Sequence, residues 1–80
     1  MLELSEPINV WVFFKQNQIS PYVFFWRNRR IKIEVINLVH TTKNGDSTAY
    51  HFSVSAEGNF YRLGFDLNTL KWFLENVDEG

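Results

Sequence analysis

Few residues of this chain have the types and spacing that chemistry requires. The only histidines are His40 and His51, and there is no cysteine. The alternation of side chains predicts that His40 faces inward and His51 outward, which favours two separate structural histidines over a two-ligand metal site completed by a carboxylate. The acidic residues fall mainly in turns and tails, and no glycine-rich phosphate loop, nucleophile elbow or zinc spacing is present. The sequence therefore predicts no catalytic residues, no metal, no cofactor and no enzymatic activity.

The strongest local signal is a basic segment that directly follows an aromatic one. After Phe24, Phe25 and Trp26, four of the eight cations of the chain fall within six residues, namely Arg27, Arg29, Arg30 and Lys32. Aromatic platforms beside cations hold single-stranded nucleic acid on small β-barrels, because bases stack on the rings and phosphates take the charges. The structural alternative is that the arginine stems simply lie across exposed rings.

A second signal is a set of aromatic residues on the face opposite the predicted core. The alternation places Trp11, Phe13, Phe60 and Phe73 outward, in strands that also carry Lys15, Arg62 and Lys71. Outward aromatic residues that form a patch are typical of a protein partner or a homodimer interface. The predicted binding residues are Trp11, Phe13, Trp26, Arg27, Arg29, Arg30, Lys32 and Arg62. The leading interpretation is a non-catalytic module that binds a protein or a second copy of itself, and the alternative is a module that binds single-stranded nucleic acid.

Length and composition set the broad class. Eighty residues predict a single domain, and 45% hydrophobic with 18% aromatic residues are far from the composition of a disordered chain. A net charge of −1 provides no overall attraction to nucleic acid or to anionic lipid. The apolar runs are too short to span a bilayer, and the acidic start of the chain does not look like a signal peptide. We therefore expect a soluble, cytoplasmic protein without a membrane partner.

The elements that position these residues are predicted to be six antiparallel strands. β-branched and aromatic stretches alternate with Asn, Gly, Asp and Ser clusters, which is typical of a meander. The first four expected strands cover residues 8–16, 19–26, 30–41 and 48–56. The fifth has Tyr61, Leu63 and Phe65 inward and the sixth has Leu70, Trp72 and Leu74 inward, with an N-terminal arm over 1–7 and a frayed acidic tail over 76–80. The expected fold is all-β, a small barrel or strongly bent sheet of SH3-like or OB-like scale. A short C-terminal helix over 68–76 is the alternative to the last strand.

The long third strand contains an irregularity. The apolar alternation slips by one residue near Val35 and Ile36, which predicts a β-bulge. Glu34 lies in the middle of this strand, where a cross-strand ion pair explains it best. The turn at Asn28 and the hairpin loop at Asn44 and Gly45 have residues that tolerate a left-handed backbone. The predicted core consists of Val10, Val12, Phe14, Ile31, Ile33, Tyr50, Phe52, Val54, Leu63, Phe65, Trp72 and Leu74.

The segment from Phe24 to Ile33, Phe-Phe-Trp-Arg-Asn-Arg-Arg-Ile-Lys-Ile, resembles a family of small uncharacterised bacterial all-β domains. Their hallmark is a Trp-Arg-Gly-Arg-like turn between two strands, and the segments at 6–8 and 70–72 are also similar, so that the resemblance covers nearly the whole chain. Asn28 stands where the family has glycine, and asparagine is the next best residue for a left-handed turn. Some relatives occur with DNA-repair polymerases, so the resemblance implies an accessory role in DNA repair or replication. It supplies no site residues.

Overall fold

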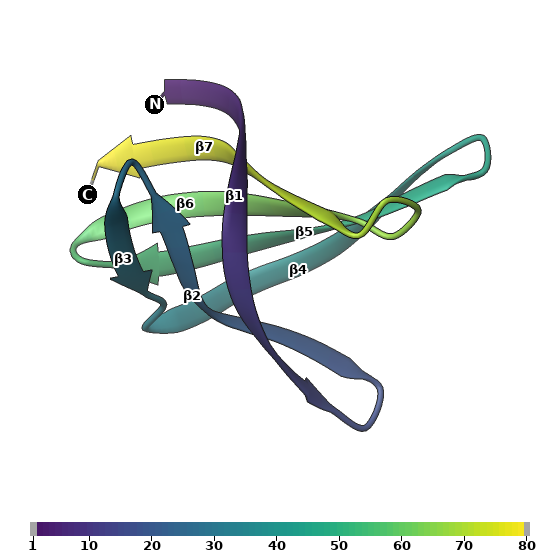
Figure 1. Ribbon diagram of the computed structural model, residues 1–80, viewed down its shortest axis with the longest axis horizontal. Coiled ribbons are helices and arrows are strands. Elements are labelled where there is room, and N and C mark those ends of the chain that lie inside the picture. Colours follow the sequence, from purple (N-terminus) through teal and green to yellow (C-terminus); the bar gives the residue numbers. More distant parts are fainter. Residues whose placement is uncertain (1, 80) are drawn as a thin grey trace.

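The computed structural model describes residues 2–79, which form one antiparallel sheet (Figure 1). The strand order across the sheet is β3-β2-β1-β7-β6-β5-β4. The strands are β1 (Leu2–Lys15), β2 (Gln18–Trp26), β3 (Arg29–Lys32), β4 (Val35–Asn44), β5 (Ser47–Ala56), β6 (Asn59–Asp66) and β7 (Lys71–Glu79). The all-β prediction is confirmed, whereas the expected number of strands, six, is wrong.

The difference arises because the expected third strand is two strands that lie on opposite edges of the sheet. β3 ends at Lys32 and β4 begins at Val35. Between them, the Ile33 amide donates to the Tyr22 carbonyl and the Glu34 amide donates to the Ser55 carbonyl, both at 2.9 Å. The slip in alternation therefore marks the point where the chain changes its partner strand. A separate register shift in β4 follows directly, between residues 36 and 38.

The sheet bends at β1, which pairs with a different strand in each half of its length. Its first half, to Ile8, pairs with β7, and its second half, from Asn9 to Lys15, pairs with β2. The two edges of the sheet come together at Ile33 and Glu34 and then diverge, so that the β1–β2 and β4–β5 hairpins point apart (Figure 1). The sheet is strongly bent, as expected, but it does not close into a barrel.

Three expectations for the ends of the chain differ from the structure. Residues 2–7, expected as an arm, belong to β1 and pair with β7. Residues 76–79, expected as a frayed tail, belong to β7 and pair with β6 or β1, while residues 1 and 80 lie outside the described part. The alternative helix over 68–76 is absent, because these residues form a turn and the start of β7. No helix within residues 2–79 has the length and apolar character needed to cross a membrane.

The core fills the inner side of the bend. Most of the predicted core residues are buried there, but Phe14 is 69% exposed and that prediction is wrong, because it lies opposite Ile19 near the end of the β1–β2 hairpin. This hairpin points away from the β4–β5 hairpin (Figure 1). Val10, Val12 and Tyr50 are only partly buried for the same reason. Phe24 is fully buried although it was not among the predicted core residues. The core cluster consists of Phe24, Ile31, Ile33, Phe52, Val54, Ala56, Tyr61, Leu63, Phe65, Trp72, Leu74 and Val77.

Candidate functional site

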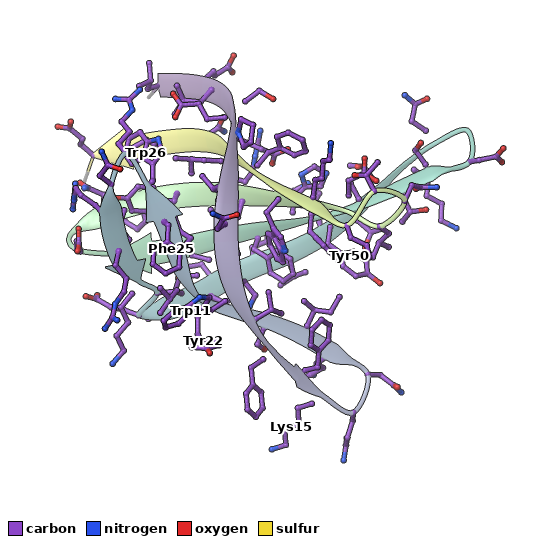
Figure 2. All side chains as sticks on the ribbon, in the orientation of Figure 1. Trp11, Lys15, Tyr22, Phe25, Trp26 and Tyr50 are labelled. Atoms are coloured by element: carbon purple, nitrogen blue, oxygen red, sulfur yellow. The ribbon has the colours of Figure 1, made fainter. Side chains whose placement is uncertain are left out.

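An aromatic and basic surface covers the outer face of β1, β2 and β3. We define this aromatic-basic face by its residues, which are Trp11, Phe13, Tyr22, Phe25, Arg30 and Lys32. The ring of Trp11 lies 5.2 Å from that of Phe25 in an edge-on arrangement and 6.3 Å from that of Tyr22. Figure 2 shows these three rings close together on this half of the sheet. They form a continuous platform in the centre of the face.

The sequence creates this platform through strand alternation and one irregularity. Trp11 and Phe13 alternate in β1 with inward residues, so they share the outer face. Tyr22 is the extra residue of β2 where the register with β1 shifts. The preceding residue is Pro21, which has no amide hydrogen to donate to a ladder, so a register shift here is expected. The shift brings a third ring to the same surface.

Two cations extend the platform at the β3 edge. The guanidinium carbon of Arg30 lies 5.7 Å from the centre of the Trp11 ring, within the range of a cation–π contact. Lys32 is opposite Val23 in the register of β2 and β3. Both side chains are exposed, and neither has an ion-pair partner in the described part of the chain. They are available to a ligand.

Trp26 and Arg27 belong to a different arrangement, which ties the β2–β3 turn to β1. The indole Nε1 of Trp26 donates to one carboxylate oxygen of Glu6 at 2.6 Å, and Arg27 donates to the other at 3.0 Å. The Arg27 guanidinium also lies 4.6 Å from the centre of the Trp26 ring. The hydrogen bonds from Trp26 and Arg27 hold the pKa of Glu6 below its ordinary value of 4.5. Asn28 has φ of 64°, the expected left-handed turn conformation.

The last two predicted binding residues are also paired with acids. Arg29 pairs with Glu57, and the Nε of Arg62 donates to Glu75 at 3.2 Å. Arg62 lies on the other half of the sheet, in β6. Of the eight predicted binding residues, the structure therefore brings together Trp11, Phe13, Arg30 and Lys32, and places the others in contacts within the fold.

The two histidines are neighbours, and the inward position predicted for His40 is wrong. His40 and His51 are directly opposite in the register of β4 and β5, so both face outward, with ring centres 4.7 Å apart. The Nδ1 of His51 donates to Glu75 at 2.8 Å, and its Nε2 lies 2.8 Å from the hydroxyl of Thr42. Glu75 lies over Gly64, where any side chain would displace its carboxylate.

This cluster has the hydroxyl, imidazole and carboxylate order of a hydrolytic relay. It lies on the outer face of the sheet, however, outside the two mainly apolar hollows where the hairpins diverge, and its Glu75 is also bound by Arg62. Within residues 2–79, no group of three or more metal-ligating side chains has metal-site geometry. We interpret the cluster as a hydrogen-bonded brace across β4, β5, β6 and β7.

Two hollows lie where the hairpins diverge. One, of about 780 Å³, lies along the second half of β1, where β1 no longer pairs with β7, and its lining includes Val12, Phe14 and Trp72 together with Trp11 and Tyr22 of the aromatic-basic face. The other, of about 360 Å³, lies between the end of the β1–β2 hairpin and the β4–β5 sheet, and its lining includes Ile36 and Val39. Both are mainly apolar, so they continue the core into open surface.

Sequence reasoning missed the acidic residues that pair with Arg27, Arg29 and Arg62. Glu6, Glu57 and Glu75 lie at least 13 positions from the arginines they contact, so no local pattern could reveal the pairs. For Glu75 a signal did exist. Gly64 lies within a strand pattern, which is typical of a bulge or a close approach, and Glu75 is the extra residue at the register shift between β6 and β7.

Comparison with family models, with curated proteins and with solved structures finds no match to this chain. The resemblance to bacterial all-β domains therefore stays a prediction. The functional conclusion has to come from the surfaces themselves.

Proposed function

We propose that this protein is a non-catalytic binding module of the cytoplasm that contacts another protein through its aromatic-basic face. The observation that carries the proposal is the exposure of three rings on paired strands. Trp11 is 46% exposed, Phe13 57% and Tyr22 45%. Tryptophan, tyrosine and arginine dominate the binding energy of protein interfaces, and exposed apolar rings that lie together are typical of an interaction site.

The mechanism follows from the rigidity of the face. Its residues project from three hydrogen-bonded strands, so that little conformational freedom is lost when a partner docks. Burial of the rings supplies the free energy of binding, whereas Arg30 and Lys32 at the margin select a partner that has acidic or carbonyl oxygens. No bond is made or broken.

A photo-crosslinking experiment tests this function. A benzophenone amino acid at Phe13, activated in cells, is expected to give a discrete adduct with a different protein. The same amino acid at Phe60, which is similarly exposed but lies on β6, outside the aromatic-basic face and outside β4, is the control and is expected to give none. The absence of any Phe13-specific adduct, or an adduct that contains only this chain, would overturn the proposal.

Single-stranded nucleic acid is the second candidate ligand, because the cation over the Trp11 ring has the stacking and charge that bases and phosphates need. The protein ligand is favoured over it for one reason. Arg27, Arg29 and Arg62 are each paired with a carboxylate, which leaves two unpaired cations on the face. An accessory role in DNA repair or replication, implied by the family resemblance, belongs to this second candidate.

An anisotropy titration separates the two ligands. If the face binds a labelled single-stranded oligonucleotide, then Arg30→Ala and Lys32→Ala together are expected to lower the salt slope by roughly 0.7 per lost phosphate contact. Lys43→Ala, on β4 at the other edge of the sheet, is the control. Binding that is absent at low salt, or a slope that these substitutions leave unchanged, would exclude nucleic acid as the ligand of this face.

A further inference from the structure

β4 is an open edge of the sheet. It is the last strand in the strand order, and nine of its ten residues are exposed, among them Val35, Leu38 and Val39, each at least half exposed. It contains no proline and only one charged residue, Lys43. The bulge at its start leaves Leu38 to Asn44 as a regular ladder with β5. Such an edge presents free backbone donors and acceptors on an apolar strand, which is a template for another strand.

The opposite edge of the sheet is protected. β3 has only four residues, and three of them are the cations Arg29, Arg30 and Lys32. Short length and positive charge are two of the devices by which natural sheets prevent edge pairing. Because one edge has these devices and the other has a long apolar strand, the open edge is a feature of this sequence and not a general property of the fold.

The charges at the two ends of β4 indicate what covers it. Glu34 immediately precedes the strand and Lys43 is its last residue but one. Both are exposed, and neither has an ion-pair partner among residues 2–79, so the ion pair predicted for Glu34 within the chain is not found. We propose that β4 pairs antiparallel with β4 of a second copy of this chain.

Antiparallel self-pairing satisfies both charges at once. Full overlap of two such strands requires a two-fold axis near Val39, the middle of the strand, and an isologous interface of this kind closes on itself as a dimer. The axis brings the Lys43 end of each copy beside the Glu34 end of the other, which gives two cross-strand ion pairs. The two seven-stranded sheets become one continuous sheet.

The inner side has room for this arrangement. Ile36 and Val39 project from β4 into the hollow of about 360 Å³, whose other wall is formed by Ile19 and its neighbours at the end of the β1–β2 hairpin. The inward side chains of an added strand would lie at the mouth of this hollow and cover Val39. The dimer thus buries apolar surface on the inner side in addition to forming backbone hydrogen bonds.

This interface does not involve the aromatic-basic face, which lies on β1, β2 and β3. Loss of dimerisation therefore leaves the proposed function untouched, and loss of the partner of the aromatic-basic face leaves the dimer untouched.

The first test is the mass of the full chain in solution, measured by light scattering over a wide range of protein concentration because dimers form by mass action. The wild-type chain is expected to have twice the mass of one chain. Leu38→Lys is expected to weaken the dimer by about 100-fold or more, since it places two lysines beside the two-fold axis. Phe60→Lys is the matched control, because Phe60 is similarly exposed but lies on β6, which has a neighbouring strand on each side. This variant is expected to stay dimeric.

The second test is a charge exchange that only antiparallel self-pairing can rescue. Glu34→Lys alone and Lys43→Glu alone are each expected to weaken the dimer several-fold, and the double variant is expected to restore it. Circular dichroism confirms that each variant is folded. A monomeric wild-type chain at every concentration, a dimer that resists Leu38→Lys, or a double variant without rescue would overturn the proposal.

Discussion

The two ends of the bent sheet differ in how far their apolar side chains are buried. At the closed end, where the edges meet, Phe24 and Ile31 are fully buried. The hydrogen bonds of Glu6 to the β2–β3 turn fasten this end. At the open end, where the hairpins diverge, Phe14 and Leu70 are each 69% exposed.

The difference shows that one apolar pattern can serve two purposes. Both ends are built from alternating strands, but Phe24 and Ile31 at the closed end are fully buried, so we expect a larger contribution to stability there. The apolar residues of the open end contribute little to holding the chain together and remain free for contact. We therefore expect the largest loss in the free energy of unfolding when a closed-end side chain is truncated, and the smallest loss when an open-end side chain is truncated.

Truncation at the closed end is expected to have the largest effect. Phe24→Ala removes a fully buried ring that lies 5.1 Å from the ring of Tyr61. Because the surrounding strands cannot collapse into the cavity, we expect a loss of about 3 to 5 kcal/mol in the free energy of unfolding, measured by urea denaturation. A loss below about 1 kcal/mol would mean that the closed end isn't the main source of stability.

Loss of the Glu6 carboxylate, whose hydrogen bonds hold the closed end, is expected to have an intermediate effect on the free energy of unfolding, and this effect depends on pH. The pKa of Glu6 is lowered in the folded protein, so its charged form adds stability above the ordinary pKa of 4.5, and this contribution is lost as the pH falls through the lowered value. Glu6→Gln is therefore expected to be less stable than the wild-type chain at pH 7 and nearly equal to it at low pH. Urea denaturation at both pH values measures the difference, and a difference that stays constant with pH would contradict the prediction.

Truncation at the open end is expected to have the smallest effect. Phe14→Ala removes a ring that is mostly in water, so the free energy of unfolding should change by no more than about 0.5 kcal/mol. The same denaturation experiment used for Phe24→Ala checks this, and the two variants form a matched pair of phenylalanine truncations. A loss comparable to that of Phe24→Ala would remove the distinction between the two ends.

Much of the fold was predictable because alternation is a local property. The strands around Phe52, Leu63 and Trp72 and the left-handed turn at Asn28 agree with the prediction. The slip near Val35 was also visible, but a bulge and a change of partner strand give the same local pattern. Both occur here, because the chain changes its partner strand between residues 32 and 35 and a bulge follows between residues 36 and 38. No local signal reports which strands lie at the two edges.

The candidate site was predictable in part. The outward direction of Trp11 and Phe13 followed from strand alternation, and the structure places both on one face with Arg30 and Lys32. Trp26, Arg27 and Arg29 followed from proximity in sequence, which does not fix the direction of a side chain around a turn. Arg62 followed from strand alternation, which does not report that β6 belongs to the other half of the sheet. Tyr22 was missed because a register shift, not alternation, places it outward.

The sequence by itself determined that the chain is all-β, where most of the strands lie, and which side of each regular strand is apolar, because these depend on the composition and the period of short segments. Only the tertiary structure decided that the sheet stays open, that the arginines at 27, 29 and 62 are paired with acids, and that β4 is an exposed edge. These properties depend on contacts between residues far apart in the chain. Local patterns report little of them, and the one signal is the position of Gly64 within a strand, beneath the carboxylate of Glu75.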